Sequence, residues 1–193
     1  KYVIDKKLTG LETIKVETNT GNIELTVLPN SLVEVNMGAP ILAPQAIPFI
    51  NAEQKANYDI DVNGKSISIG AVSMGNPHGV LIVDDTASAE VEVIGTALQQ
   101  NAAFPNGVNV GFMQVLDRSN IKLRVLERGV GETLACGTGA CAAVVSGILQ
   151  DKLDSTVVVE LPGGKLTVSW FGGEQPVTMT GPAVTVYEGQ YKL

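Results

Sequence analysis

The chain has 193 residues, of which 45% are hydrophobic, 17% charged and 5% aromatic, enough for one sizeable core or two small ones. Its 13 Lys and Arg against 20 Asp and Glu give a net charge of −7, which leaves no basic surface for a nucleic acid or an anionic membrane. The uncharged run at residues 133–150 is too short and too polar to span a bilayer. We therefore expect a soluble globular protein.

Short runs of alternating apolar and polar residues dominate the chain, and Gly, Pro and Asn separate them, which is typical of strands. The expected strands, in chain order, are 13–18, 23–28, 32–37, 58–62, 66–69, 80–83, 108–116, 121–127, 156–161, 165–170 and 184–187. Residues 139–149 differ, because apolar side chains at helical spacing occupy both broad faces; they predict a buried helix. Residues 89–99 predict a second, weaker helix.

Two features concern the compartment and the start of the chain. Residues 1–7 lack the apolar segment and cleavage site of a secretory signal, and two cysteines make no disulfide framework, so we expect a cytoplasmic protein. A first residue of Lys instead of Met suggests that the natural N-terminus lies further upstream.

An internal repeat supports this suggestion, although hairpins of similar composition can also match by chance. The repeat unit would have roughly 143 residues with one buried helix, and the counterpart of Cys136 would lie about seven residues before Lys1. We therefore expect a fragment that holds the last strands of a first unit and a complete second unit. The matching segments are 7–8 with 152–153, 16–25 with 159–168, and 35–40 with 177–182, at offsets between 142 and 145.

Residues 127–141 run from a strand through a Gly-rich turn into the buried helix. Small residues after Cys136 let a ligand approach the backbone, and the N–H groups of Gly137, Thr138 and Gly139 at a helix start favour a carboxylate or phosphate. The same partial positive charge favours the Cys136 thiolate, which predicts a base or nucleophile. The alternative is a small apolar cysteine packed at a helix start.

Cys141, five positions further along the same pattern, is expected to be a core thiol. The helical spacing places it poorly for a disulfide with Cys136. With one His and no CxxC pair in the chain, we expect no metal site.

Residues 75–79 (Gly-Asn-Pro-His-Gly) form a second polar cluster between two expected strands. A stiff Asn-Pro turn there could direct the side chains of Asn76 and His78 into a pocket, where His78 could accept a proton near neutral pH. The alternative is a solvated histidine on a surface turn. Asn109 interrupts an expected strand. It therefore indicates either a hydrogen-bonded ligand contact or an outward-facing position.

Glu127 and Arg128 place opposite charges at a strand end. An exposed ion pair is one interpretation. Beside an anion-binding helix start, however, a planar guanidinium and a carboxylate suit a ligand that carries both charges, and an amino acid is the simplest such ligand.

Four motifs together resemble diaminopimelate epimerase, in the family's order and over most of the chain from Met37 onward. The motifs are Gly-Asn-Pro-His at 75–78, Asn-Val-Gly-Phe at 109–112, Glu-Arg-Gly-Val-Gly-Glu-Thr at 127–133 and Ala-Cys-Gly-Thr-Gly-Ala-Cys-Ala at 135–142. One departure is Gly79, where many relatives have Cys.

The resemblance implies an α+β fold of two similar domains, each an antiparallel sheet wrapped around a central helix, of which the second is complete here. Residues 1–36 would be a remnant of the first domain, residues 37–181 the second domain, and residues 182–193 a strand that returns to the first. It also implies a cytoplasmic epimerase that needs no cofactor, interconverts LL- and meso-diaminopimelate for lysine and peptidoglycan synthesis, and forms a homodimer in many relatives.

The resemblance further assigns roles to single residues. Cys136 would be one of two catalytic cysteines, and the other would precede Lys1. His78 and Glu127 would assist proton transfer, and Gly137 and Thr138 would stabilise the reacting carboxylate. The distal carboxylate would be held by Asn76, Asn109 and Arg128. The distal ammonium would be held by Glu127 and the Arg128 carbonyl.

Two other functions remain open. One is another racemase of this fold, resembling proline racemase, although Asn109 and Arg128 would then lack a distal carboxylate to bind. The other is a non-catalytic module that binds an amino acid or an anion.

Overall fold

The computed structural model describes residues 2–18, 21–51 and 53–191, and none of its helices is long and apolar enough to cross a membrane. The helices are α1 (Tyr2–Asp5), α2 (Val91–Gln99) and α3 (Gly137–Leu149), with a 3-10 turn at Pro44–Ala46. The strands are β1 (Thr13–Thr18), β2 (Gly21–Val27), β3 (Leu32–Asn36), β4 (Tyr58–Val62), β5 (Lys65–Ser73), β6 (Pro77–Ile82), β7 (Asn109–Asp117), β8 (Asn120–Glu127), β9 (Gly131–Thr133), β10 (Thr156–Leu161), β11 (Gly164–Ser169) and β12 (Thr178–Pro182).

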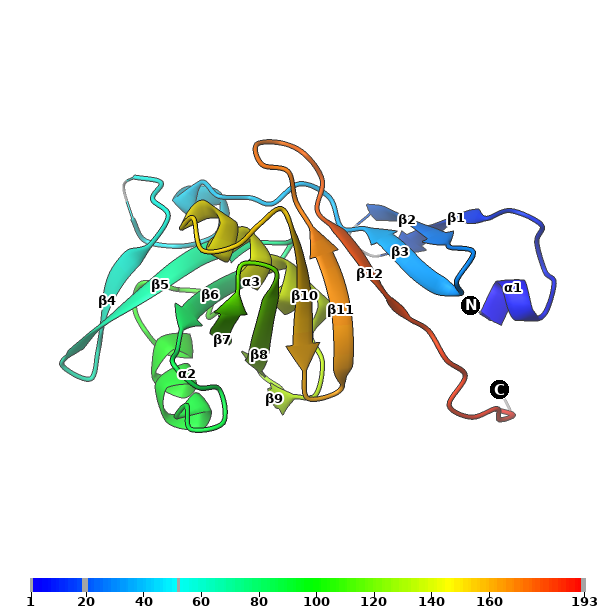
Figure 1. Cartoon of the computed structure of the whole chain (residues 1–193). Coiled ribbons are helices and arrows are strands. Elements are labelled where there is room, and N and C mark those ends of the chain that lie inside the picture. The colour runs from blue at the N-terminus through cyan, green and yellow to red at the C-terminus, as the bar shows by residue number, and fades with distance from the viewer. Residues whose placement is uncertain (1, 19–20, 52, 192–193) are drawn as a thin grey trace.

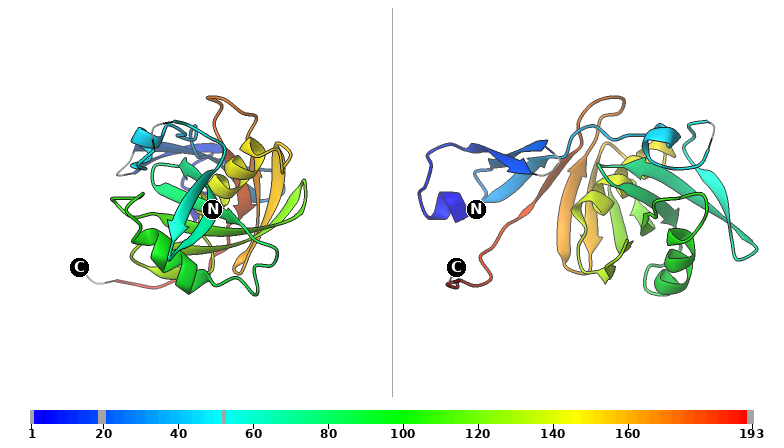
Figure 2. Two further views of the ribbon diagram at one scale, coloured as in Figure 1. Left: turned by 90° about the vertical axis from the view of Figure 1, so that its left-hand side faces the viewer. Right: turned by 180° about the vertical axis from the view of Figure 1, so that it is seen from behind.

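The strands form one sheet in the order β1-β2-β3-β12-β11-β10-β8-β7-β6-β5-β4, with β9 added to β8. Pairing is antiparallel except between β6 and β7 and between β8 and β10. The sheet curls around α3, which contacts β5 to β8, β11 and β12 (Figures 1 and 2). The structure thus confirms the expected α+β fold with a central helix.

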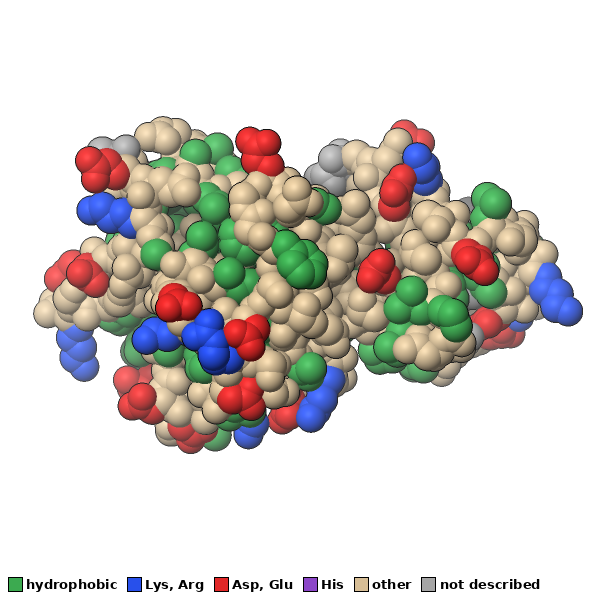
Figure 3. Space-filling view, turned by 45° about the horizontal axis from the view of Figure 1, so that its top comes forward, with side chains coloured by type: hydrophobic (Ala, Val, Ile, Leu, Met, Phe, Trp, Pro, Cys, Tyr) green, Lys and Arg blue, Asp and Glu red, His purple; other side chains and the backbone are tan. Residues whose placement is uncertain are grey.

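The molecule has a large part, built from β4 to β11 with α2 and α3, and a small part with α1 and β1 to β3 (Figure 1). Strand β12 joins them, because it pairs with β11 on one side and β3 on the other. The two parts meet at a waist in the space-filling view (Figure 3). After β12 the chain returns beside the small part, where Lys6 Nζ lies 2.7 Å from Glu188 Oε1.

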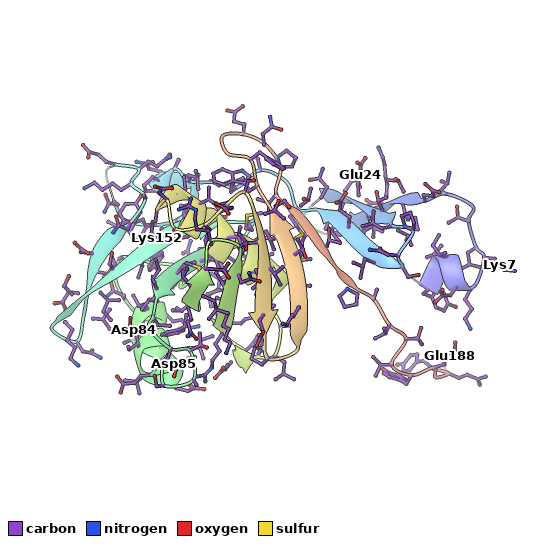
Figure 4. All side chains as sticks on the ribbon, viewed as in Figure 1. Lys7, Glu24, Asp84, Asp85, Lys152 and Glu188 are labelled. Atoms are coloured by element: carbon purple, nitrogen blue, oxygen red, sulfur yellow. The ribbon has the colours of Figure 1, made fainter. Side chains whose placement is uncertain are left out.

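Segments that the internal repeat matches have similar local structures, which supports the repeat. Hairpin β1–β2 corresponds to β10–β11, and the glycine after each turn, Gly21 and Gly164, has a positive φ of 126° and 143°. Helices α1 and α3 also end alike: Leu8 N donates to Val3 O and Lys152 N to Gly147 O, both at 2.9 Å. Lys7 follows α1 in the small part and Lys152 follows α3 in the large part (Figure 4).

Most expected elements are present with shifted ends, but one expected strand is absent and two strands were not expected. Residues 184–187 form no strand, and Val184, Val186 and Tyr187 are exposed. Alternating apolar residues form a strand only where a neighbour pairs with them and covers one face. Strands β9 and β12 were not expected, because β9 has three residues and β12 contains Gly181 and Pro182; pairing with β8, and with β3 and β11, forms them.

Two hydrophobic clusters make up the core. One surrounds α3, in which every side chain from Ala140 to Val145 is fully buried. The other lies between α2 and β4 to β7, where Phe49 stacks on Phe104 with ring centroids 4.8 Å apart. Because α3 is enclosed on all sides, its small residues set how closely the strands approach it.

The approach of β5 to α3 depends on Gly70. A Cβ atom at this position would lie 1.9 Å from Ser146 Oγ. We predict that Gly70→Ala lowers the free energy of unfolding, measured by urea denaturation, by about 1–3 kcal/mol through overpacking. Gly10→Ala is the matched control, because a Cβ at Gly10 has no neighbour within 4 Å.

Adding Ser146→Ala removes the colliding Oγ atom and should restore part of the lost stability. Equal stabilities for Gly70→Ala and Gly10→Ala would show that the β5–α3 contact is not as close as the structure has it.

Candidate active site

The residues singled out in the sequence gather at one edge of the sheet, beside the start of α3. Strands β6 and β7 begin at this edge, with His78 paired to Asn109 across the parallel ladder. Strand β8 ends at the same edge with Glu127, because it runs antiparallel to β7. Helix α3 begins there with Cys136 as its N-cap residue.

The Cys136 side chain is a free thiol and only 5% exposed. Burial raises the pKa of Cys136 above its usual value; hydrogen bonds from the Thr138 hydroxyl and the Gly139 N–H oppose this rise, and the negative charge of Glu127 adds to it. The expected effect of the helix start is present, because the Gly139 N–H lowers the pKa of Cys136, but burial outweighs it and the thiol is less acidic than an ordinary cysteine. Removing the sulfur from water disfavours the thiolate more than the local donors favour it.

The glycines that flank Thr138 bring the helix start close to its neighbours. A Cβ at Gly139 would lie 3.1 Å from Cys136 Sγ, and one at Gly137 would lie 3.2 Å from both Sδ and Cε of Met179 on β12. The first bond of the helix runs from Ala140 N to Cys136 O at 2.9 Å. The N–H groups of Gly137 and Thr138 therefore have no acceptor within the helix and can bind an anion.

A chain of hydrogen bonds leads from β6 to the cysteine. His78 Nε2 lies 3.1 Å from Asn76 Oδ1, Asn76 Nδ2 donates to Thr138 Oγ1 at 3.4 Å, and Thr138 Oγ1 lies 3.7 Å from Cys136 Sγ. Because Asn76 Oδ1 only accepts, His78 Nε2 carries the proton in this bond. Because Thr138 Oγ1 accepts from Asn76, its own hydrogen is left for the sulfur.

His78 is 1% exposed, so the interpretation as a solvated turn residue was wrong. It lies within β6, one residue after the strand begins. Burial lowers its pKa from 6.5 to about 4. His78 is therefore neutral at pH 7 and does not accept a proton near neutral pH, contrary to the expectation, because the interior does not solvate an imidazolium ion.

Asn109 is buried and hydrogen-bonded to the backbone at both ends of its amide, so it does not face outward. Its Oδ1 accepts from Arg128 N at 2.8 Å, and its Nδ2 donates to Pro77 O at 3.3 Å. Asn109 thus holds the start of β6 and the end of β8 at fixed positions.

The Arg128 guanidinium donates to Asn106 O, and the Arg128 stem passes over Gly107, where a Cβ would lie 2.8 Å from Arg128 Cδ.

In the described part of the chain, Glu127 and Arg128 do not pair with each other, so the ion-pair interpretation was wrong. Glu127 Oε1 instead accepts a hydrogen bond of 2.6 Å from Thr133 Oγ1, and Arg128 is exposed beyond the strand end. The two charged groups therefore remain available to a ligand.

Cys141 is fully buried with a pKa raised by burial to about 12, which confirms a core thiol. Within residues 2–18, 21–51 and 53–191, no group of three His, Cys, Asp or Glu residues is placed to hold a metal ion.

Two cavities are candidates for a ligand. One of about 720 Å³ opens beside Met74, Gly75 and Thr138 and is bounded on its other side by β2 and residues 36–41. Another of about 840 Å³ lies between α2 and the β4–β5 turn, and the described residues that line it include no cysteine or histidine. We place the site at the first cavity, because Thr138 connects it to Cys136.

Sequence reasoning missed Thr133, Asn106, Gly107 and Met179, which position Glu127, Arg128 and the helix start. For Thr133 the only sequence signal was its place in the Gly-Glu-Thr motif at 131–133. No local pattern indicates the other three, because their partners are distant in sequence or bind through the backbone.

Similarity to known proteins covers the whole chain. The family model described as "Diaminopimelate epimerase" matches residues 70–186. Diaminopimelate epimerases of Teredinibacter turnerae and Ectopseudomonas mendocina are 53% identical over 192 residues and 57% identical over 194 residues. Each alignment covers 100% of this chain and 70% of the relative.

Solved structures share the fold at low identity. A phenazine biosynthesis protein of the PhzF family from Bacillus anthracis is 16% identical with a TM-score of 0.68, covering 100% of this chain and 73% of its own. A hydroxyproline epimerase from Agrobacterium vitis is 15% identical with a TM-score of 0.64, covering 94% and 61%. The helix start at Cys136, the motifs at the sheet edge and the matches above 50% identity show that the chain belongs to the diaminopimelate epimerase family.

Proposed function

We propose that this chain supplies one face of the active site of an enzyme that interconverts LL- and meso-diaminopimelate. The observation that carries the proposal is the buried thiol of Cys136 at the N-terminus of α3, next to Glu127 and to N–H groups that can bind a carboxylate. Epimerisation needs a group that removes the Cα proton and a second group that supplies a proton to the opposite face. Cys136 is the group on one face.

Proton removal leaves two electrons at Cα, and this charge spreads into the α-carboxylate. The N–H groups of Gly137 and Thr138 would stabilise the developing negative charge, because they have no acceptor within α3 and α3 adds its dipole. This arrangement supports a reaction without a cofactor. In one direction of the reaction, the Cys136 thiolate removes the proton and becomes a thiol while the second cysteine supplies a proton. In the other direction the two cysteines exchange these roles.

The other site residues would bind or orient the substrate. Asn76, Asn109 and Arg128 would hold the distal carboxylate, and Glu127 with the Arg128 carbonyl would hold the distal ammonium. His78, neutral at pH 7, would act on Cys136 through Asn76 and Thr138 as a hydrogen-bond donor. Glu127 would act on it through its charge.

The second thiol would come from outside these 193 residues. Their two cysteines lie on one helix, and a single helix start cannot reach both faces of Cα. We propose residues 1–36 as part of the first domain, 37–181 as the second domain, and 182–193 as a segment that returns to the first. The contact between Lys6 and Glu188 supports this return.

Three further properties belong to the proposal. The enzyme would serve lysine and peptidoglycan synthesis, since diaminopimelate is its substrate. It would work in the cytoplasm, because the reaction needs free thiols and a reducing compartment preserves them. A homodimer is proposed from the family resemblance alone, and the net charge of −7 supports a protein without a nucleic-acid partner.

The competing functions predict different ligands. A proline-type racemase would leave Asn109 and Arg128 without a distal carboxylate, and a binding module would need no thiol at the reacting carbon. Both would leave the proton at the Cα of diaminopimelate unexchanged in heavy water.

In the full-length protein, LL-diaminopimelate should gain deuterium at Cα in heavy water while it converts to the meso form. Cys136→Ala should lower kcat by ~10²–10⁴-fold, because it removes one acid/base group. NMR follows exchange, and optical rotation follows inversion. Near-normal turnover by Cys136→Ala would remove Cys136 from the mechanism.

The 193-residue chain serves as the comparison for this experiment. It should not invert the substrate, although slow exchange with retention is compatible with one thiol. Rapid inversion by the chain alone would place both acid/base groups within these residues.

Arg128→Lys tests the assignment of the distal carboxylate. Lysine keeps the charge but loses the planar two-point contact, so the Cα atom of the substrate should be displaced. Because the reacting carbon is then misplaced, kcat/KM should fall by about tenfold to a hundredfold. The measurement is steady-state kinetics of the full-length enzyme with diaminopimelate, with Arg118→Lys, in the β7–β8 turn, as a control. An unchanged kcat/KM would show that Arg128 does not bind the substrate.

A further inference from the structure

We propose that Thr133 is a positioning residue that fixes the Glu127 carboxylate beside Cys136, and that the ion pair between Arg124 and Glu132 holds Thr133 in place. The inference deepens the proposed function and rests on it, since it concerns the acid/base pair at the same site.

The contact between Thr133 and Glu127 is short and directional. Thr133 Oγ1 donates to Glu127 Oε1 at 2.6 Å, and both side chains are half-buried. A carboxylate only accepts hydrogen bonds, so the hydroxyl proton points to Glu127. With Oε1 engaged, rotation of the carboxylate is restricted and Oε2 is left for the thiol or the substrate.

Thr133 lies on β9, a strand of only three residues, which needs side-chain contacts in addition to its backbone pairing with β8. Arg124 on β8 provides it: Nε donates to Glu132 Oε1 at 2.6 Å and Nη2 to Glu132 Oε2 at 2.7 Å. Arg124 Nη1 also donates to Thr86 O at 2.7 Å. Each charged side chain is only about a quarter exposed, at 27% and 26%. This two-point contact fixes the orientation of β9 on β8.

The next residues carry the same segment into α3. Leu134 O accepts from Gly163 N at 2.7 Å, and Cys136 follows two residues later as the N-cap of α3. The segment from Glu132 to Cys136 is therefore held by β8 and by the turn before β11. Thr133 is the point in this segment that contacts Glu127.

Glu127 is the charged group that acts on Cys136 from β8, and its negative charge contributes to the raised pKa of the thiol. Cys141 lies five residues after Cys136 on α3, and burial, with a smaller effect from Cys136, raises its pKa to about 12. His78 on β6 connects to Cys136 only through Asn76 and Thr138 and is neutral above a pKa of about 4. A change in the position of Glu127 should therefore appear in the ionisation of Cys136.

The hydroxyl can be removed without changing the shape of β9. Thr133 pairs with Val125 through the backbone, and valine has the same branching and suits a strand equally well. Thr133→Val therefore removes the bond to Glu127 alone. Thr133→Ser keeps a hydroxyl at the same place and should restore the wild-type behaviour.

The experiment measures the rate at which iodoacetamide alkylates Cys136 in the 193-residue chain as a function of pH, with mass spectrometry locating the modified cysteine. In Thr133→Val, Glu127 is released toward solvent, and the midpoint of the profile should move down by on the order of half a pH unit. Thr133→Ser should match the wild type. An unchanged or higher midpoint in Thr133→Val would overturn the proposal.

Three controls keep the result specific. Thr156→Val removes an exposed hydroxyl, paired with Ser169 Oγ at 3.0 Å, and should leave the midpoint unchanged. Cys141 is fully buried and should stay unmodified while the fold is intact. If Thr133→Val does not fold, Thr133→Ala tests the same loss of the hydroxyl.

A double variant tests whether the hydroxyl acts through Glu127. In a Glu127→Gln background, Thr133→Val should cause no further shift, and a shift of the full size would contradict the proposal. The assay needs no turnover. A shifted midpoint together with a full-length protein that does not epimerise would overturn only the proposed function, and an active full-length enzyme without the shift would overturn only the role of Thr133.

Discussion

Enclosure of α3 by the curled sheet is the constraint on which the rest of the structure depends. The helix can lie there only because its residues are small, and because β5 carries a glycine where it meets Ser146. The enclosure also decides where the helix begins. It places the N-cap residue, Cys136, at the edge where β5 and β8 end and β6 and β7 begin, so that polar residues from separate motifs gather at the same edge of the sheet.

The same enclosure sets the electrostatics of the site. Burial disfavours the thiolate form of Cys136 and the protonated form of His78. It therefore raises the pKa of Cys136 and lowers that of His78. A helix start alone does not overcome this cost. The thiolate depends on specific donors, the Thr138 hydroxyl and the Gly139 N–H, while Glu127 opposes it. Donors that favour the thiolate of a buried thiol suit a reaction in which the group must act as thiolate in one direction and thiol in the other.

How much could be predicted from the sequence depended on whether a feature is local. The helix at α3 was predicted because apolar residues on both faces indicate enclosure. The repeated hairpin was predicted because the sequence at residues 16–25 resembles that at 159–168. The position of Cys136 at a helix start followed from the glycines after it. Burial of His78 could not be predicted, since it depends on β6 lying between β5 and β7. The role of Thr133 depends on Arg124 and Glu132, which no spacing rule connects.

Donors at the start of α3 lower the pKa of a thiol that burial makes less acidic, and titration of the Cys136 thiolate by ultraviolet absorbance measures their effect. Thr138→Val removes the hydroxyl that lies 3.7 Å from Cys136 Sγ and keeps the branched shape of the side chain. Because this donor lowers the pKa of Cys136, its loss should raise the pKa further, and Thr138→Ser should leave it near the wild-type value. An unchanged or lower pKa of Cys136 in Thr138→Val would show that the Thr138 hydroxyl does not stabilise the thiolate.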